Sequence, residues 1–468
     1  MAGRRHYFFC GIGGSGMLPL SLIVSARGDE VSGSDRALDQ GRTAAKFDFL
    51  RARGFRLFPQ DGSGITNGNL IVVTSAAVEE TVPDVIAARR AGAIVIRRAE
   101  LLAELFNASS LPIGVAGTSG KSTTTGMIAW ILEAAGRKPT VMNGAIMKNF
   151  VNATIPFASA VVGKGDNFVS EIDESDGSIA LYAPAIAVLT NVAHDHKSLA
   201  DLRRLFAEFI GKARRTIVNR DNEEAFQLAG ALPSDRLMSF SLKDASADLF
   251  GQNLVPSEFG IAFEVREGGG EPVRISLKVP GRHNVANALA ALGAARAAGV
   301  SLAEAAHALS DFAGIRRRLE LVGSANGVTV IDDFAHNPDK IAATLTTLHD
   351  FPGRLLVMFQ PHGFGPLRLM KDQLIACFAD NLRAEDVLIM PEPVYFGGTT
   401  DRSVSSIDIV DGVAARGRQA QVFADRAQCG DRLVEIAKAG DRIVVMGARD
   451  DTLSQFAVEL VDRIRGSK

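Results

Sequence analysis

Short apolar runs alternate with longer stretches of helical apolar spacing along this chain. In the first hundred residues the spacing predicts a helix over 14–27, and apolar runs predict strands at 6–11, 30–33, 69–75 and 93–97. Such alternation is typical of a parallel sheet whose strands are joined by crossover helices. We therefore predict that the chain opens with a Rossmann-like α/β domain.

The alternation continues in two further blocks after a polar segment at 106–110. The second block predicts helices at 283–298 and 302–309 and strands at 111–116, 167–172, 185–190, 260–266 and 272–279. The third predicts strands at 328–331, 355–359, 386–389, 419–423 and 442–446. We therefore predict an α/β protein of three domains, with limits at 1–108, 109–313 and 314–468.

Composition excludes several classes of protein. The net charge is −2, so no strong field attracts nucleic acid or an anionic membrane, and no apolar run approaches the length of a membrane span. Three cysteines in 468 residues argue against a disulfide framework or a zinc cluster and suit a reducing compartment. We expect a soluble cytoplasmic protein, monomeric or homodimeric, that binds neither nucleic acid nor membrane.

A glycine-rich turn follows the apolar run at 111–116 and leads into Lys121, Ser122 and a helical pattern. Backbone N–H groups of such a turn can surround a triphosphate, the lysine can pair with its β- and γ-phosphates, and the serine can bind Mg²⁺. The general P-loop pattern has a glycine where this chain has Val115, and Gly117 stands in its place. An ordinary strand-to-helix turn is the alternative, but the combination of Gly, Lys and Ser after an apolar strand favours ATP.

A second glycine pattern, Gly-x-Gly-x-x-Gly at 11–16, lies between the first strand and the first helix, with Asp35 further on. This pattern is typical of a site for a dinucleotide, where the acid reaches a ribose hydroxyl. It suits a UDP-sugar equally well. The separate ATP pattern favours the UDP-sugar, because an NAD-dependent oxidoreductase has no use for ATP.

Acidic residues crowd the end of the strand predicted at 167–172. Carboxylates at this end of a strand, beside a nucleotide, are natural Mg²⁺ ligands, and a solvated acidic turn is the alternative. We favour a metal site for the run Glu171, Asp173, Glu174 and Asp176. His194, Asp195 and His196 follow the next strand and could supply a metal ligand or a base; a structural role is as good an explanation for His194.

Two segments of the third block carry further polar groups. Residues 332–338 end a predicted strand and precede a helix that Asn337 and Pro338 would start. A capped turn without a functional role is the alternative explanation of this pattern. Arg316, Arg317 and Arg318 could be a solvated face or could reach a phosphate.

Together these segments resemble the Mur ligases, ATP-dependent enzymes that build the peptide of bacterial cell-wall precursors. The resemblance covers essentially the whole chain in the right order, and the family's own P-loop pattern, G-T-x-G-K-[ST], matches residues 117–122. The runs that carry it lie at 6–17, 32–35, 74–76, 98–100, 117–124, 171–178, 190–196, 281–287, 317–320 and 333–338.

The resemblance implies a ligase that uses ATP and Mg²⁺ to join the carboxylate of UDP-N-acetylmuramate to the amine of an amino acid or short peptide, through an acyl phosphate, in peptidoglycan precursor synthesis. L-alanine is the favoured acceptor. Attachment of a recycled tripeptide to the same nucleotide sugar is the alternative.

The family's roles carry over to matching positions of this chain. The implied UDP-sugar residues are Gly13, Gly14, Ser15, Gly16, Met17, Asp35, Thr74, Ser75 and Ala76. The implied ATP residues are Gly117, Thr118, Ser119, Gly120, Lys121, Ser122, Thr123, His283, Asn284, Asn287, Arg318 and Asp333. The implied metal ligands are Ser122, Glu171 and His196, the implied catalytic residues are Lys121, Glu171, His196 and Arg318, and the acceptor would meet His336, His362 and Arg368.

The chain departs from the family pattern mainly where the acceptor would bind. Gly363 and Pro366 stand where the alanine-adding branch has arginines that grip the amino acid's carboxylate, and Arg368 could partly substitute. Residues 359–362 look like that branch, whereas 326–338 read more like the tripeptide branch. Ser119 also replaces the usual P-loop histidine.

Three other functions stay open on the sequence alone. They are an NAD-dependent oxidoreductase with an incidental P-loop, a non-catalytic nucleotide-binding module, and a folylpolyglutamate synthetase, which the glycine pattern at 11–16 disfavours.

Overall fold

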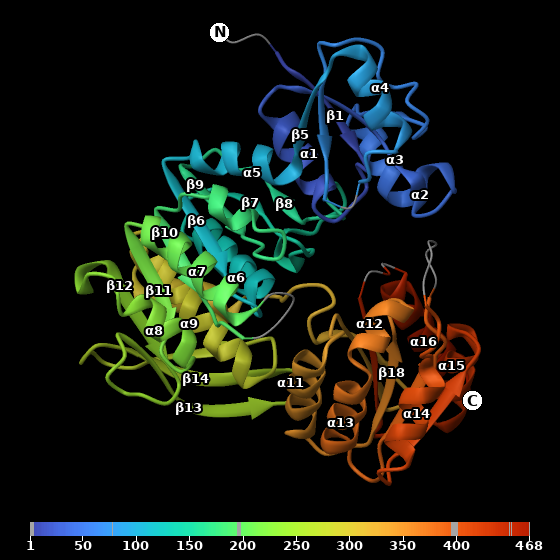
Figure 1. The fold of residues 1–468 in the computed structure, drawn as a ribbon. Helices are drawn as coiled ribbons and strands as arrows, with labels where there is room; N and C mark the ends of the chain where they lie inside the picture. Colours follow the sequence, from blue (N-terminus) through green and yellow to red (C-terminus); the bar gives the residue numbers. More distant parts are fainter. Residues whose placement is uncertain are drawn as a thin grey trace. The chain divides into compact units, whose positions relative to one another are not determined.

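The computed structural model describes residues 4–76, 78–193, 198–394, 401–448, 450 and 452–467. Packing divides the chain into two compact units. Figure 1 labels the helices and strands along the chain. Unit 1 comprises Met1–Leu254, Phe263–Leu277 and Asn284–Ala313, and unit 2 comprises Val255–Ala262, Lys278–His283 and Gly314–Lys468. In the part of the chain that the structure describes, no helix is both long and apolar enough to cross a membrane.

Unit 1 begins with a five-stranded parallel sheet in the order β3-β2-β1-β4-β5. Its strands are β1 His6–Cys10, β2 Glu30–Ser34, β3 Arg56–Phe58, β4 Ile71–Thr74 and β5 Ile94–Arg97. Its helices are α1 Met17–Ala26, α2 Arg36–Asp39, α3 Ala44–Ala52, α4 Pro83–Ala91 and α5 Arg98–Asn107. Tyr7 and Phe9 pack into one apolar cluster and Phe8 into another, because successive side chains point to opposite faces of the sheet. Residues 7–10 of the central strand are therefore all buried.

A ten-stranded sheet follows, most of it in unit 1, in the order β15-β14-β13-β12-β11-β10-β6-β9-β7-β8. Its strands are β6 Leu111–Ala116, β7 Thr140–Met142, β8 Ala160–Val161, β9 Asn167–Glu171, β10 Ile186–Leu189, β11 Arg215–Asn219, β12 Leu237–Ser241, β13 Leu249–Ser257, β14 Gly260–Glu267 and β15 Val273–Leu277. The α-helices are α6 Lys121–Ala134, α7 Leu199–Lys212, α8 Glu223–Ala229, α9 Arg282–Ala297 and α10 Leu302–Ser310, and the short 3₁₀ helices are η1 Lys148–Phe150, η2 Ser178–Leu181 and η3 Ser234–Arg236. Strand β6 pairs in parallel with β9 and β10, so the segments after these three strands meet at one edge of the sheet.

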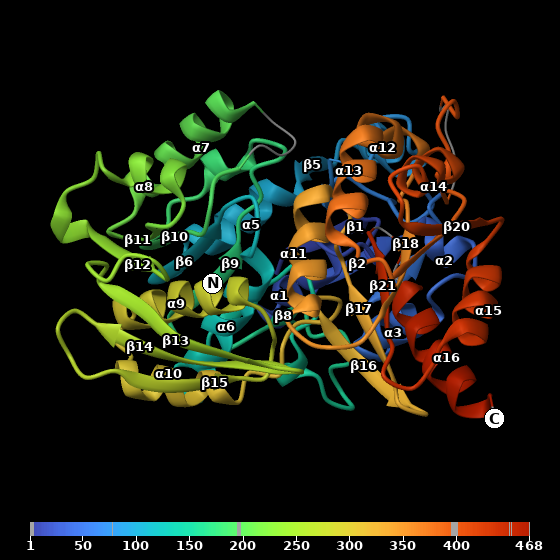
Figure 2. The ribbon, with the colours of Figure 1, turned by 90° about the horizontal axis from the view of Figure 1, so that it is seen from below.

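Unit 2 contains a six-stranded sheet in the order β16-β17-β21-β18-β19-β20, parallel except for β16. Its strands are β16 Glu320–Ala325, β17 Val328–Asp333, β18 Leu355–Gln360, β19 Val387–Pro391, β20 Gln419–Phe423 and β21 Arg442–Gly447. Its helices are α11 Pro338–His349, α12 Phe364–Leu369, α13 Lys371–Asn381, α14 Ser406–Ala414, α15 Arg426–Ile436 and α16 Leu453–Gly466. Helices α11, α13 and α14 cover one face of this sheet and α15 and α16 the other, as Figure 2 shows for α11, α13, α15 and α16.

The expected α/β class with three sheets is confirmed, and strands are found at the positions named from the sequence. Helix α11 begins at Pro338, and the Asn337 side chain caps it by accepting a hydrogen bond from Lys340 N at 3.0 Å, as its sequence predicts. The first helix begins at Met17 rather than at Gly14, because residues 11–16 form a turn in which Gly14 N donates to Gly11 O at 3.1 Å. The limits expected at 108 and 313 remain predictions; packing joins the first two sheets in one unit.

All three cysteines of the chain are free and buried. Burial raises the pKa of the thiols of Cys10, Cys377 and Cys429 to about 12. None of the three therefore resembles a reactive thiol, which needs a lowered pKa and access to solvent.

Candidate active site

The turn between β6 and α6 is shaped by close packing. Gly117 and Gly120 have φ angles of 130° and 84°, which favour glycine. A Cβ added at Gly117 would lie 2.1 Å from Thr190 Oγ1, and one at Gly120 would lie 2.4 Å from Asn287 Oδ1. Both the φ angles and the close approach of Thr190 and Asn287 therefore favour glycine at these two positions.

Polar side chains that follow β10 hold this turn in place. Thr190 Oγ1 donates to Ser119 O at 2.7 Å, and Asn191 Nδ2 donates to the same oxygen at 3.1 Å. Asn191 Oδ1 accepts hydrogen bonds from Thr118 Oγ1 at 2.6 Å and from Ser119 N at 3.0 Å. The turn is thus preformed at the N-terminus of α6, where a helix favours an anion.

Lys121, the first residue of α6, makes two close contacts with oxygen. Its Nζ donates to Gly117 O at 2.7 Å and to Glu174 Oε2 at 2.9 Å. Glu174 is only 4% exposed, and burial raises the pKa of its carboxyl group. A phosphate bound at the turn would replace one or both of these oxygens as the partner of the Lys121 ammonium group. The sequence identified Glu174 as a possible metal ligand and missed its pairing with the lysine.

Ser122 and Glu171 form the part of the candidate metal site that the structure describes. Ser122 Oγ donates to Glu171 Oε2 at 2.6 Å, and Asn143 Nδ2 donates to Ser122 O at 3.0 Å. A Cβ added at Gly144 would lie 2.1 Å from Glu171 Oε1. The Glu171 carboxylate therefore occupies the space that a side chain at position 144 would need. A hydroxyl and a carboxylate are oxygen ligands of the kind Mg²⁺ prefers, and the pair fits this ion.

Part of the expected ligand set lies outside the described residues. These are His194, Asp195 and His196, and the role of His196 as a ligand stays a prediction. Among the described residues, no group of three or more His, Cys, Asp or Glu side chains could hold a metal ion.

The close approach of Gly144 to Glu171 gives a first test. We expect Gly144→Ala to lower activity strongly, because the added methyl group must displace the Glu171 carboxylate from Ser122. Gly211→Ala is the matched control, since a Cβ at Gly211 has nothing within 4 Å. The measurement is the dependence of activity on Mg²⁺ concentration; equal activity of the two variants would contradict the proposed role of Glu171.

A cavity of about 310 Å³ in unit 1 joins the glycine turn at 11–16 to the residues around Glu171. The lining that matters here comprises Gly14, Gly16, Arg98, Asn143, Glu171 and Tyr182. A ligand whose phosphates lie on the glycine turn can therefore extend to the carboxylate beside the P-loop. The sequence placed these two motifs in separate domains and could not show that they share one cavity.

Asp35 has partners within the protein. Its Oδ2 accepts a hydrogen bond from Gly13 N and its Oδ1 one from Ala37 N, both at 2.8 Å, and Lys46 Nζ donates to Gly13 O at 3.0 Å. Asp35 therefore caps α2 and fixes the glycine turn. A contact with a ribose stays a prediction. Thr74 ends β4 and Ser75 follows it, and Ser75 lines the cavity.

The asparagines expected at the adenine lie beside the P-loop helix. Asn287 Oδ1 accepts a hydrogen bond from Thr124 Oγ1 at 3.3 Å, and Asn287 Nδ2 donates to Asn284 Oδ1 at 3.1 Å. Packing assigns the third expected residue, His283, to unit 2.

The arginines at 316–318 have different surroundings within unit 2. Arg317 is 8% exposed and donates to Gly447 O at 2.7 Å and to Asp332 Oδ1 at 3.3 Å, which is a structural role. The guanidinium of Arg318 lies 4.5 Å from the centre of the Phe334 ring. Both oxygens of Asp333 accept hydrogen bonds within the unit, from Leu319 N at 3.0 Å and Thr344 Oγ1 at 2.5 Å. The ATP roles expected of Arg318 and Asp333 stay predictions.

Two of the three expected acceptor residues lie together. The rings of His336 and His362 are perpendicular, with centroids 5.4 Å apart, and His336 Nδ1 is 2.9 Å from Phe334 O. Burial lowers the pKa of His336 to about 3, so its imidazole is neutral at physiological pH. Arg368 instead pairs with Asp401 at 2.5 Å, and both side chains are about half exposed.

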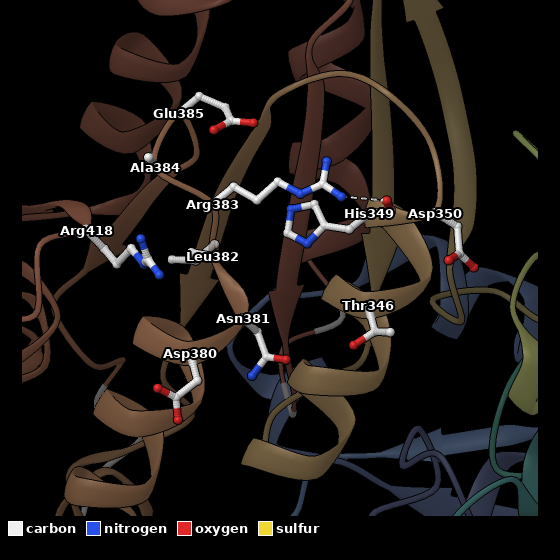
Figure 3. A pocket seen from close by; sticks show the side chains of 10 residues that line it. All are labelled: Thr346, His349, Asp350, Asp380, Asn381, Leu382, Arg383, Ala384, Glu385 and Arg418. Atoms are coloured by element: carbon white, nitrogen blue, oxygen red, sulfur yellow. Dashed lines mark hydrogen bonds between the residues drawn. The ribbon is translucent and has the colours of Figure 1, made fainter.

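A larger open depression of about 620 Å³ lies elsewhere in unit 2 (Figure 3). It is formed by the C-terminal ends of α11 and α13 and by segments that precede β19 and β20, and Arg383 donates to His349 O there at 2.8 Å. It therefore lies at the amino ends of the strands, whereas ligands of open parallel sheets bind at the carboxyl ends.

Three models of one family match successive parts of the chain. The model described as "Mur ligase family, catalytic domain" matches residues 6–110, "Mur ligase middle domain" matches 115–295, and "Mur ligase, glutamate ligase domain" matches 317–449.

Individual proteins are similar over nearly the whole chain. The UDP-N-acetylmuramate–L-alanine ligases of Desulfosudis oleivorans and Paracoccus denitrificans are each 34% identical, over 95% and 97% of this chain and 96% of their own. Among solved structures, the UDP-N-acetylmuramate–alanine ligase of Thermotoga maritima has a TM-score of 0.80 at 25% identity, covering 99% of this chain and 100% of its own. A murein peptide ligase from Psychrobacter arcticus has a TM-score of 0.71 at 25% identity, covering 99% of both chains.

Proposed function

The chain belongs to the Mur ligase family, and we propose that it joins the carboxylate of UDP-N-acetylmuramate to the amine of L-alanine with cleavage of ATP, in the synthesis of peptidoglycan precursors. We assign the UDP-sugar to residues 1–108, ATP to 109–313 and the acceptor to 314–468. The observation that carries the proposal is the cavity that joins the glycine turn at 11–16 to Glu171.

The proposed reaction has two steps. A muramate carboxylate oxygen attacks the γ-phosphorus of ATP, an O–P bond forms, and the bond from this phosphorus to ADP breaks. The amine of the acceptor then attacks the acyl phosphate; an N–C bond forms, inorganic phosphate leaves, and the nitrogen loses a proton. Negative charge gathers on the transferred phosphoryl group in the first step, so preorganised positive groups lower its barrier.

Residues of unit 1 account for the groups this step needs. The backbone of residues 117–120 would hold the triphosphate and Lys121 would neutralise charge on its outer phosphates. Ser122 and Glu171 would hold Mg²⁺, which supplies charge neutralisation and orientation of the phosphates. The glycine turn would bind the other substrate so that its carboxylate lies near Glu171.

This assignment uses both nucleotide sites. A nicotinamide-dependent oxidoreductase would leave the P-loop without a role, and a non-catalytic module would not need the ion-binding pair Ser122 and Glu171. The use of ATP also agrees with the cytoplasmic location that the cysteine content predicts. Whether the protein is a monomer or a homodimer stays a prediction.

A short peptide is the second candidate acceptor. It is favoured by Gly363 and Pro366, because neither can form the bidentate grip on a free amino acid's carboxylate that an arginine provides. L-alanine is placed first because relatives 34% identical to this chain are ligases for L-alanine.

One experiment separates these possibilities. The protein is incubated with ATP, Mg²⁺, UDP-N-acetylmuramate and a pool of amino acids and cell-wall peptides, and the products are identified by mass spectrometry. The proposal requires ADP, phosphate and an adduct of UDP-N-acetylmuramate with alanine. An adduct with a tripeptide would establish the second acceptor, and the absence of any ATP-dependent adduct would reject a ligase.

Arg368 tests the acceptor site within unit 2. We expect Arg368→Ala to raise the KM of the acceptor more than about tenfold, the loss of one charge-assisted hydrogen bond, while the KM of UDP-N-acetylmuramate stays unchanged. Arg465→Ala is the matched control, because Arg465 forms a similar exposed ion pair with Asp462 at 2.8 Å. An unchanged acceptor KM would remove Arg368 from the site and leave it as the surface partner of Asp401.

A further inference from the structure

Arg98 lines the cavity that joins the glycine turn to Glu171, and it is not among the residues proposed to bind ATP, Mg²⁺ or the acceptor. It is the first residue of α5 and its side chain is half-buried. A Cβ added at Gly16 would lie 3.1 Å from Arg98 Cδ and 3.2 Å from its Nη1. The guanidinium therefore lies directly against the glycine turn.

Among the residues that the structure describes, no oxygen is a partner of the Arg98 guanidinium. Within the described residues it forms neither a hydrogen bond nor an ion pair. The preceding residue, Arg97, shows the contrast, since it donates to Ser75 O at 3.3 Å and pairs with Glu80 at 3.5 Å. Asp173 and Tyr182 line the same cavity as Arg98. An unpaired guanidinium in such a cavity is suited to bind an anionic ligand.

The substrates offer three anionic groups that Arg98 could bind: the muramate carboxylate, the γ-phosphate of ATP and the diphosphate of the nucleotide sugar. The muramate carboxylate and the γ-phosphate are proposed to lie beside Glu171, which lines the cavity, and Lys121, which belongs to the P-loop. The turn and the N-terminus of α1 face the phosphates of the nucleotide sugar. A planar guanidinium that lies against the same turn can bind two phosphate oxygens at once.

We infer that Arg98 binds the diphosphate of the nucleotide-sugar substrate and positions the muramate carboxylate toward Glu171. This rests on the proposed function in one respect, that the substrate is a nucleoside diphosphate sugar. Arg98 is thus a binding and positioning residue and takes no part in bond making.

Calorimetric titration of the full-length protein with UDP and with UMP tests the inference without turnover. UMP lacks the β-phosphate, so Arg98→Ala should weaken binding of UDP at least tenfold and binding of UMP much less. Arg98→Lys keeps the positive charge but loses the planar guanidinium that can donate two parallel hydrogen bonds. It should recover part of the UDP affinity. In the ligation assay Arg98→Ala should raise the KM of UDP-N-acetylmuramate and leave the KM of ATP unchanged.

Arg51→Ala is the control for a general loss of positive charge, because Arg51 is exposed in the same unit and pairs with Asp48 at 2.9 Å. An unchanged affinity of Arg98→Ala for UDP, or an equal loss for UDP and UMP, would overturn the assignment. Failure of the unaltered protein to bind UDP at all would instead count against the proposed function, so the two failures are distinct.

Discussion

Replacing Lys121 by methionine is expected to slow ligation about a hundredfold or more while the protein stays folded. Its ammonium group lies at the start of α6, 2.7 Å from Gly117 O, where the outer phosphates of ATP are proposed to bind. Loss of one preorganised charge contact to a reacting group costs roughly 3 kcal/mol or more of transition-state stabilisation. The measurement is release of phosphate that depends on UDP-N-acetylmuramate.

The fold should survive this change for a physical reason. Lys121 pairs with the buried Glu174, and removal of one partner of such a pair leaves a buried charge. Burial already raises the pKa of Glu174, so this carboxyl group can take up a proton when the lysine is absent. Circular dichroism checks the fold, and the exposed Lys164 provides the control Lys164→Met. Turnover at the unaltered rate by Lys121→Met, with ATP still required, would exclude the P-loop lysine from the reaction.

Glu171→Gln is expected to have an effect of similar size, with a different signature. The substitution keeps the shape of the side chain and its contact with Ser122 but replaces a charged ligand by a neutral amide, which binds Mg²⁺ poorly. We expect a loss of about a hundredfold or more at fixed Mg²⁺ and a higher Mg²⁺ concentration for half-maximal rate. Steady-state rates over a range of Mg²⁺ concentrations provide the test.

The control for Glu171→Gln is Glu208→Gln, which removes an exposed carboxylate of the same unit that pairs with Lys212 at 3.0 Å. If Glu171→Gln retained the Mg²⁺ dependence of the unaltered protein, the metal would have to bind through other residues.

The apolar pattern predicted the central strands of each sheet because these strands are buried on both faces. Alternate residues of β18 show this directly, since Val357 packs with one set of helices and Met358 with the other. Strands β3, β8 and β16 were not proposed, and they form sheet edges, where one side is open. The interior strands β7, β12 and β13 were not proposed either, whereas the edge strands β5, β15 and β20 were. Position in the sheet therefore explains only part of what the apolar pattern missed.

The candidate site was predictable where local sequence determines the chemistry. Lys121 and Ser122 follow a glycine turn between a strand and a helix, and this order alone indicates a phosphate site. The partner of Lys121 was not predictable, because the run 171–176 holds four carboxylates and only the folded turn decides that Glu174 points inward. Arg98 was missed because its relevance depends on its distance from Gly16, which lies far from it in the sequence.

The burial of all three cysteines has a practical consequence for spectroscopy. With pKa values of about 12, the thiols of Cys10, Cys377 and Cys429 form almost no thiolate at neutral pH, and maleimide reagents react with thiolate. A cysteine introduced at an exposed position, such as that of Lys164, would therefore be labelled selectively in the folded chain. Fluorophores or spin labels can thus be attached without first removing the native cysteines, so distances during turnover can be followed in a protein whose core is unaltered.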